Sequence, residues 1–284
     1  MTAPGDDTNR RSAPIGVFDS GLGGLSVVRQ LQTELPRESL LYIADSLYCP
    51  YGVRSVDEIC TRSRLLVGDL VAAGVKMVVV ACNTASAAAI DLIRAEFEIP
   101  IVAMEPAVKP AITLTTSGKI AVLATPRTAS SERLQLLIQR WGTGIDIRAI
   151  GVPGLADLVE AGEWSGPGVA SLLVPIVAAQ VTDGVDVIVL GCTHYPFAQE
   201  TIRAIAGPDV RIIDSGNAVA RRSRDQLIHH DLHATVGQAA TFTMWTTGDP
   251  TTVATIASRL LGRSIQVAAV PPANTIGHQE RSQA

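Results

Sequence analysis

The sequence lacks the features of membrane, secreted and nucleic-acid-binding proteins. No stretch approaches the roughly 18 uninterrupted apolar residues that a membrane span requires. The polar segment 1–14 contains no apolar core of a signal peptide, so we expect a loose tail and a cytoplasmic protein. The formal net charge is −4, which offers nucleic acid no general attraction. We therefore expect neither a membrane nor a nucleic-acid partner.

Motifs for metals and organic cofactors are missing as well. The four cysteines form no CxxC pair and match no zinc spacing, so we expect free thiols and no bound metal. The only three lysines in the sequence stand in no recognisable Schiff-base setting. There is no Walker A sequence. The four cysteines are Cys49, Cys60, Cys82 and Cys192. We therefore expect the chemistry of this chain to need no cofactor.

What the sequence does contain is an alternation of short apolar runs with helix-length amphipathic segments. This alternation predicts parallel α/β sheets, and 284 residues allow one large domain or two medium ones. The runs are rich in valine and isoleucine without clean alternation, which favours strands buried on both faces. The expected strands are 15–18, 40–44, 76–81, 99–103, 119–124, 185–190 and 210–213.

The two halves of the chain resemble each other. The segment from Ile15 (IGVFDS) matches the one from Ile120 (IAVLAT), and the cysteine of MVVVACNT matches that of DVIVLGCT at a similar offset. We infer an α/β fold of two pseudo-twofold-related lobes, each a mainly parallel sheet flanked by helices, with the active site in the cleft between them. The expected divisions are a first lobe of 15–105 with 216–270, a second lobe of 106–215, and flexible tails at 1–14 and 271–284.

Cys82 and Cys192 occupy matching positions, each directly after a predicted strand and before a helix. Ligands of α/β proteins bind at such strand ends, and a helix N-terminus favours a thiolate. A single cysteine in an apolar run is usually inert packing. Two cysteines at equivalent places in related lobes favour function instead, because the twofold arrangement makes both thiols face one cleft.

Two opposed acid/base groups can invert a stereocentre. One group removes the α-proton from one face of the carbon, and the other delivers a proton to the opposite face. Thiols suit this task because their ordinary pKa of about 8.5 can be brought toward neutrality. Without a cofactor, the carbanion must be stabilised by hydrogen bonds and charge. The paired cysteines therefore predict a cofactor-independent amino-acid racemase.

Five motifs in this order resemble the glutamate racemase family, and they span most of the chain. They are FDSGLGGL from Phe18, PYG from Pro50, ACNTA from Ala81, GCTHYP from Gly191 and IDSG from Ile213. The resemblance implies interconversion of L- and D-glutamate without a cofactor, supply of D-glutamate for peptidoglycan, a two-lobed fold and a homodimer. The GCTH segment also separates this chain from aspartate racemases, which usually carry an acidic residue at the position of His194.

The resemblance also implies roles for individual residues. Cys82 and Cys192 would be the acid/base thiols, assisted by Asp19 and His194 respectively. Judged from the residues alone, Asp19 can equally be a helix cap and His194 a satisfied half-buried histidine. The residues implied in substrate binding are Asp19, Ser20, Tyr51, Gly52, Asn83, Thr84, Thr193 and His194.

Some positions depart from the family pattern or leave their role open. Arg127 replaces a family glycine, which leaves the roles of Thr125 and Thr128 undecided. Glu160 matches a family acidic position that supports the histidine, but we take it by default as a solvated helix charge. Cys49 lies in a variable segment, so we assign it no catalytic role.

Two other classes of protein share some of these features. The Gly21-Leu-Gly-Gly turn loosely imitates a dinucleotide site, but Ser26 stands where the motif requires its last glycine. A two-lobed binding protein without catalysis would leave the paired thiols unused. A sibling racemase for aspartate or a hydantoin is disfavoured by His194 and by the IDSG motif.

Overall fold

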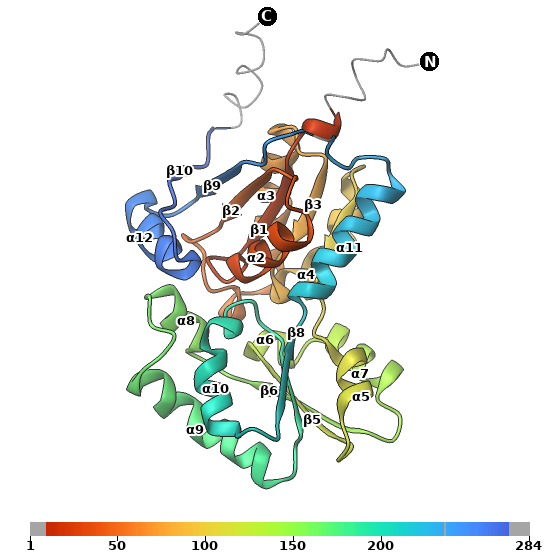
Figure 1. Cartoon of the computed structure of the whole chain (residues 1–284), viewed down its shortest axis with the longest axis vertical. Helices are drawn as coiled ribbons and strands as arrows, with labels where there is room; N and C mark the ends of the chain where they lie inside the picture. Colours follow the sequence, from red (N-terminus) through yellow and green to blue (C-terminus); the bar gives the residue numbers. More distant parts are fainter. Residues whose placement is uncertain (1–9, 236, 273–284) are drawn as a thin grey trace, which may run out of the picture.

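The computed structural model describes residues 10–235 and 237–272, and it holds two β-sheets whose strand pairs are all parallel within these residues (Figure 1). The first sheet has the order β10-β9-β2-β1-β3-β4, and the second has the order β6-β5-β7-β8. The strands of the first sheet are β1 (Ile15–Asp19), β2 (Leu40–Ala44), β3 (Met77–Val80), β4 (Ile101–Ala103), β9 (Phe242–Thr246) and β10 (Val267–Ala269). Those of the second are β5 (Lys119–Ala124), β6 (Asp146–Gly151), β7 (Val187–Leu190) and β8 (Arg211–Asp214).

The internal repeat of the sequence has a structural counterpart. The order β2-β1-β3-β4 in the first sheet is repeated as β6-β5-β7-β8 in the second. Strands β3 and β7 are equivalent in this comparison, and each leads into one of the two predicted site cysteines. The α/β fold with two parallel sheets is therefore as the sequence predicts. Strands β9 and β10 extend the first sheet beyond the repeat.

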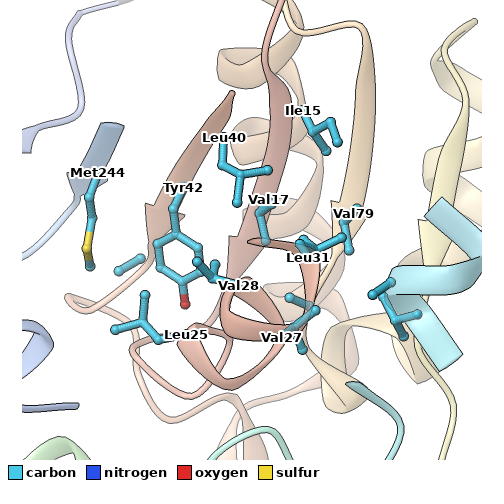
Figure 2. Close-up of a cluster of buried hydrophobic side chains, with 14 of the residues drawn as sticks. Ile15, Val17, Leu25, Val27, Val28, Leu31, Leu40, Tyr42, Val79 and Met244 are labelled. Atoms are coloured by element: carbon cyan, nitrogen blue, oxygen red, sulfur yellow. The ribbon is translucent and has the colours of Figure 1, made fainter. Parts of the chain in front are cut away.

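Helices cover both faces of the first sheet. On one face, apolar side chains of α2 pack against β1 and β2; Figure 2 shows Leu25, Val28 and Leu31 beside Val17 and Tyr42. The opposite face is covered by two helices that hold a second apolar cluster. Because helices cover both faces of the sheet, apolar and polar residues need not alternate along its strands. The first face carries α2 (Leu25–Glu34), α11 (Gly216–His229) and α12 (Pro250–Leu261), and the second carries α3 (Val56–Ala72) and α4 (Asn83–Glu96).

The second sheet is covered in the same way (Figure 1). Its strands contribute side chains alternately to two apolar clusters, one on each face. One face packs against α8 (Leu155–Glu160), α9 (Pro167–Thr182) and α10 (Gln199–Ala206). The other packs against α5 (Val108–Leu114) and α7 (Glu132–Trp141). Short elements at the strand ends are η1 (Tyr51–Val53), α6 (Pro126–Ala129) and η2 (Tyr195–Ala198).

The structure describes only part of the segments near the two chain ends. Residues 10–14, expected to form part of a loose tail, are held in place because Lys76 Nζ donates to the Arg11 carbonyl over 2.6 Å and the Arg11 guanidinium pairs with Asp231. The remaining tail residues 1–9 and 273–284 lie outside the described residues. The lobe boundaries at 105 and 215 stay a prediction. Among the helices that are described, none has the length and apolar character to cross a membrane.

Candidate active site

Side chains from the two sheets meet where the carboxyl ends of β1, β3 and β7 come together. Thr193, which follows β7, donates from Oγ1 to Asp19 Oδ2 over 3.3 Å. Cys82 and Cys192 are both buried here, with 4% and 6% of their surface exposed. Two pockets reach the region, one of about 420 Å³ beside Thr84 and one of about 440 Å³ beside Glu160. The fold thus gathers residues that the sequence separates widely.

Cys82 caps the helix that follows it. Its Sγ accepts a hydrogen bond from the Ala85 N–H over 3.4 Å, and it donates to Ser20 Oγ over 3.7 Å. Burial, and then the neighbouring Asp19 carboxylate, raise the pKa of Cys82 well above its ordinary value, although both hydrogen bonds oppose this. The expectation that the helix N-terminus brings the pKa of this thiol toward neutrality is therefore wrong. Because its pKa is raised, Cys82 keeps its proton at neutral pH.

Asp19 ends β1 and is completely buried. Oδ1 accepts from the Ser20 N–H over 2.7 Å, and Oδ2 accepts from the Gly24 N–H over 2.5 Å. Burial raises the pKa of Asp19, and a side-chain hydrogen bond connects it to Cys82. Asp19 therefore stabilises the turn into α2 without being its N-cap, which is Gly24, and its carboxyl group lies beside the Cys82 thiol.

Cys192 has a different partner. Its Sγ lies 3.6 Å from His194 Nδ1, and His194 Nε2 lies 2.6 Å from Glu160 Oε1. Burial alone would lower the pKa of His194, but hydrogen bonds with Cys192, Cys49 and Glu160 raise it well above its usual value. His194 therefore places positive charge beside Cys192.

Glu160 is not the solvated helix charge that we took it to be by default. Besides His194, it accepts the Leu22 N–H at Oε1 over 2.5 Å, and its side chain is only 18% exposed. The last residue of α8 therefore connects the second sheet to the turn after β1. This contact spans 138 positions of the sequence, so no local pattern could have indicated it.

Three threonine side chains form a cluster between the sheets. Thr84 Oγ1 lies 3.0 Å from both Thr125 Oγ1 and Thr128 Oγ1. Gly52 packs against this cluster, since a Cβ at Gly52 would lie 3.0 Å from Thr125 Cβ. The roles of Thr125 and Thr128 were undecided from the sequence, and the structure brings both to the predicted substrate-binding residue Thr84.

The other predicted binding residues differ in what they can offer a ligand. Asn83 is 4% exposed, and neither polar atom of its side chain has a hydrogen-bond partner in the described part of the chain. The Tyr51 hydroxyl donates to Asp45 Oδ2 over 2.6 Å, and burial and Asp45 raise its pKa. The Thr193 carbonyl accepts from Ser26 Oγ over 2.9 Å. Asn83 is thus available to a ligand, whereas the hydroxyl of Tyr51 is committed to Asp45.

The turn after β1 touches the His194 side of the site through two glycines. A Cβ at Gly21 would lie 2.2 Å from Glu160 Oε1 and 2.6 Å from Cys49 Sγ, and a Cβ at Gly23 would lie 2.3 Å from His194 Nδ1. Real Cβ atoms do not approach so closely, so a larger residue at either position would displace these side chains. Cys49 also lies in this region, although the sequence had assigned it no role.

Gly23→Ala will displace the His194 ring. We expect a loss of about 1–3 kcal/mol of unfolding free energy from overpacking, together with a fall in activity. Gly68→Ala is the matched control, because Gly68 lies inside α3 and its added Cβ would meet Phe97 at 4.0 Å. That variant should gain about 0.5–1 kcal/mol and keep its activity. Urea unfolding and turnover measure both effects, and an active Gly23→Ala protein would contradict the expectation.

The fold and the site together define a class of protein. Two buried thiols follow equivalent strands of two similar sheets, one beside a carboxyl group and the other beside a histidine. Each thiol therefore has its own neighbour with which to exchange protons. This is the arrangement of an α/β acid–base enzyme.

Comparison with known proteins identifies the family. Residues 15–222 match the model of the Asp/Glu/Hydantoin racemase family, and the chain belongs to this family. The glutamate racemase of Ectopseudomonas mendocina (strain ymp) is 43% identical over 260 residues, which cover 91% of this chain and 98% of that protein. The glutamate racemase of Roseiflexus sp. (strain RS-1) is 44% identical over 255 residues, covering 89% and 94%.

Solved structures agree with this assignment. Glutamate racemase isoform RacE1 from Bacillus anthracis superimposes with a TM-score of 0.82 at 32% identity, covering 93% of this chain and 99% of that one. The glutamate racemase of Francisella tularensis, solved in complex with D-glutamate, superimposes with a TM-score of 0.81 at 28% identity, covering 93% and 99%.

Proposed function

We propose that this protein is a glutamate racemase, an isomerase that interconverts L- and D-glutamate by acid/base chemistry at Cys82 and Cys192. The observation that carries the proposal is the placement of these two thiols after β3 and β7, equivalent strands of the two sheets. Curated glutamate racemases that match over about nine-tenths of the chain support glutamate as substrate. By its family, the enzyme supplies D-glutamate for peptidoglycan.

The two sulfurs have different neighbours with which to exchange protons. Burial, and then the neighbouring Asp19, raise the pKa of Cys82, which therefore starts as a thiol. His194, whose pKa is raised well above its usual value, lies 3.6 Å from the Cys192 sulfur and can exchange a proton with it. In one direction, the Cys192 thiolate takes the α-proton and the Cys82 thiol gives its proton to the opposite face of the carbon. The reverse direction exchanges these roles.

Binding residues surround the reacting groups. The unpartnered amide of Asn83 can bind a substrate carboxylate, and backbone N–H groups at the start of α4 can do the same. We place Ser20, Tyr51, Gly52, Thr84 and Thr193 in the same role, with Tyr51 acting other than through its hydroxyl. Asp19 and His194 reach both a thiol and the substrate.

The proposal is tested by incubating the protein with L-glutamate in deuterated water, without pyridoxal phosphate. We expect the optical rotation to fall to zero as the α-proton signal disappears from the NMR spectrum. Parallel incubations with L-aspartate and with a chiral hydantoin distinguish a sibling racemase. Tight binding of glutamate with no exchange of its α-proton would identify a binding protein and refute the proposal.

Glu160→Gln should move the alkaline limit of activity. Burial tends to lower the pKa of His194, and Cys192, Cys49 and the Glu160 carboxylate raise it. The protonated, active form is therefore present at low and neutral pH and is lost as the pH rises through this raised pKa. Without the Glu160 charge the pKa falls, so the decline of kcat/KM must begin at lower pH than in the wild type. Superimposable pH–rate profiles for the two proteins would show that Glu160 does not act through His194.

We further propose a cytoplasmic homodimer. Free thiols at all four cysteines suit a reducing compartment. Apolar side chains lie exposed along the segment from β2 through α3, including Val53 at 75% and Leu65 at 53% exposure. We place the dimer interface on these side chains. Sedimentation equilibrium should give a dimer mass for the wild type and a monomer mass for Val53→Lys/Leu65→Lys, and a wild-type monomer would refute the dimer.

A further inference from the structure

Cys49, Glu160 and His194 form a cluster that the racemase mechanism uses only in part. One ligand atom from each residue, the Cys49 sulfur, a Glu160 oxygen and a His194 ring nitrogen, lies within 4.8 Å of the other two. Cys49 belongs to the segment after β2 of the first sheet, whereas Glu160 and His194 belong to the second-sheet half. The spacing of these residues along the chain matches no zinc motif, because only the fold brings them together.

The chemistry of these three side chains is that of a zinc site. Thiolate, imidazole and carboxylate are the protein ligands that Zn²⁺ takes, at bond lengths of about 2.0–2.3 Å. Tetrahedral bonds of that length put ligand atoms roughly 3.3–3.8 Å apart, so small rotations suffice to bring the three onto one ion. Three protein ligands leave a fourth position open to water.

The surroundings hold the cluster and give a cation access to it. The backbone of the turn at Gly21 packs against both the Cys49 sulfur and the Glu160 carboxylate, and the Leu22 N–H fixes Glu160 Oε1. The pocket of about 440 Å³ is lined by both Cys49 and Glu160. Two further carboxylates, Asp157 and Asp249, line the same pocket and favour the entry of a cation.

We propose that Cys49, Glu160 and His194 bind Zn²⁺ and that this ion inhibits the enzyme. On binding, the Cys49 sulfur and the His194 nitrogen facing Glu160 each bond to the ion in place of a bound water, and the protons that they carried leave to solvent. Bonds to the ion replace the 2.6 Å contact between His194 and Glu160, and this shifts the imidazole ring that lies 3.6 Å from the Cys192 sulfur. The ion also ties the segment after β2 to the second-sheet half. The inhibition rests on the proposed function, whereas the metal site does not.

The test measures zinc binding and racemisation separately on the full-length, reduced protein. Zn²⁺ affinity is obtained by competition with a chromophoric chelator, and Co²⁺ is used as a second probe, because a thiolate ligand adds a near-ultraviolet charge-transfer band. Cys49→Ser and Cys49→Ala are the test variants. Cys60→Ser is the matched control, since Cys60 is also a free, half-buried thiol but its sulfur lies at the Ala88 carbonyl.

We expect the wild type and Cys60→Ser to bind one zinc per chain, to show the cobalt–thiolate band and to lose activity reversibly, with recovery on adding chelator. Both Cys49 variants should lack the band and bind zinc at least about tenfold more weakly. Equal zinc affinity and an unchanged cobalt band in the Cys49 variants would overturn the site. Zinc that binds through Cys49 without slowing racemisation would overturn the inhibition. A protein that binds zinc in this way but never racemises glutamate would refute the proposed function alone.

Discussion

Replacing either Cys82 or Cys192 by serine will lower kcat for glutamate racemisation by about 10²–10⁴-fold in both directions. The hydroxyl of serine fills nearly the same volume but is far too weak an acid to serve as the thiol does at neutral pH. Each sulfur acts as base in one direction and as acid in the other, so a single replacement must affect L-to-D and D-to-L turnover alike. Polarimetry with each enantiomer measures both rates.

The control for this experiment is Cys60→Ser, which removes a half-buried thiol whose sulfur lies 3.4 Å from the Ala88 carbonyl. It should racemise glutamate at the wild-type rate. Thermal unfolding of all three variants establishes that the fold survives. If Cys82→Ser or Cys192→Ser kept wild-type turnover in either direction, the two-thiol mechanism would be wrong.

Asp19→Asn should be nearly as damaging, with an expected loss of about 10²–10³-fold in kcat. Burial raises the pKa of the Asp19 carboxyl group, which makes it able to accept the Cys82 proton, and an amide cannot do so. The amide NH₂ would also face one of the N–H donors that the carboxylate now satisfies, at Ser20 or Gly24, at a cost of about 1–3 kcal/mol in stability. Turnover and urea unfolding separate the two effects.

Asp45→Asn is the matched control for Asp19→Asn. Asp45 is also fully buried and follows the neighbouring strand β2, but it accepts hydrogen bonds from Tyr51 and Arg62. This variant should lose stability while its kcat changes much less. Equal losses of kcat in the two variants would mean that Asp19 supports the fold and takes no part in proton transfer.

The sequence predicted those parts of the fold that reside in apolar runs. Strands β2 and β5 have the predicted bounds, and the repeat placed Cys82 and Cys192 after equivalent strands. Strand β6 was missed, because its sequence DIRAIG is interrupted by charged residues and it lies half exposed at a sheet edge. Strands β9 and β10 were missed too, since they extend the first sheet outside the repeat.

The two thiols of the site could be predicted from the sequence, whereas the contacts and the pKa values around them could be predicted less well. Nothing in the pattern of α8 distinguishes Glu160 from a surface charge, because its partners come from other elements. The pKa of Cys82 could not be judged from its helix N-terminus alone, since burial and Asp19 outweigh that effect. Cys49 reaches His194 only through the tertiary arrangement. Local patterns thus locate reactive atoms, and the fold determines their charge state.

The two halves of the chain share a strand order, but the residues at the ends of equivalent strands differ. Asp19 ends β1, whereas Ala124 ends the equivalent strand β5. Mirror-image amino acids have equal free energies in water, so no protein can shift their ratio from one at equilibrium. Detailed balance then forces kcat/KM to be identical for the two enantiomers, however unlike the two flanks are. The difference between Asp19 and Ala124 can therefore change kcat and KM only by the same factor. The enantiomer with the lower KM must also have the lower kcat.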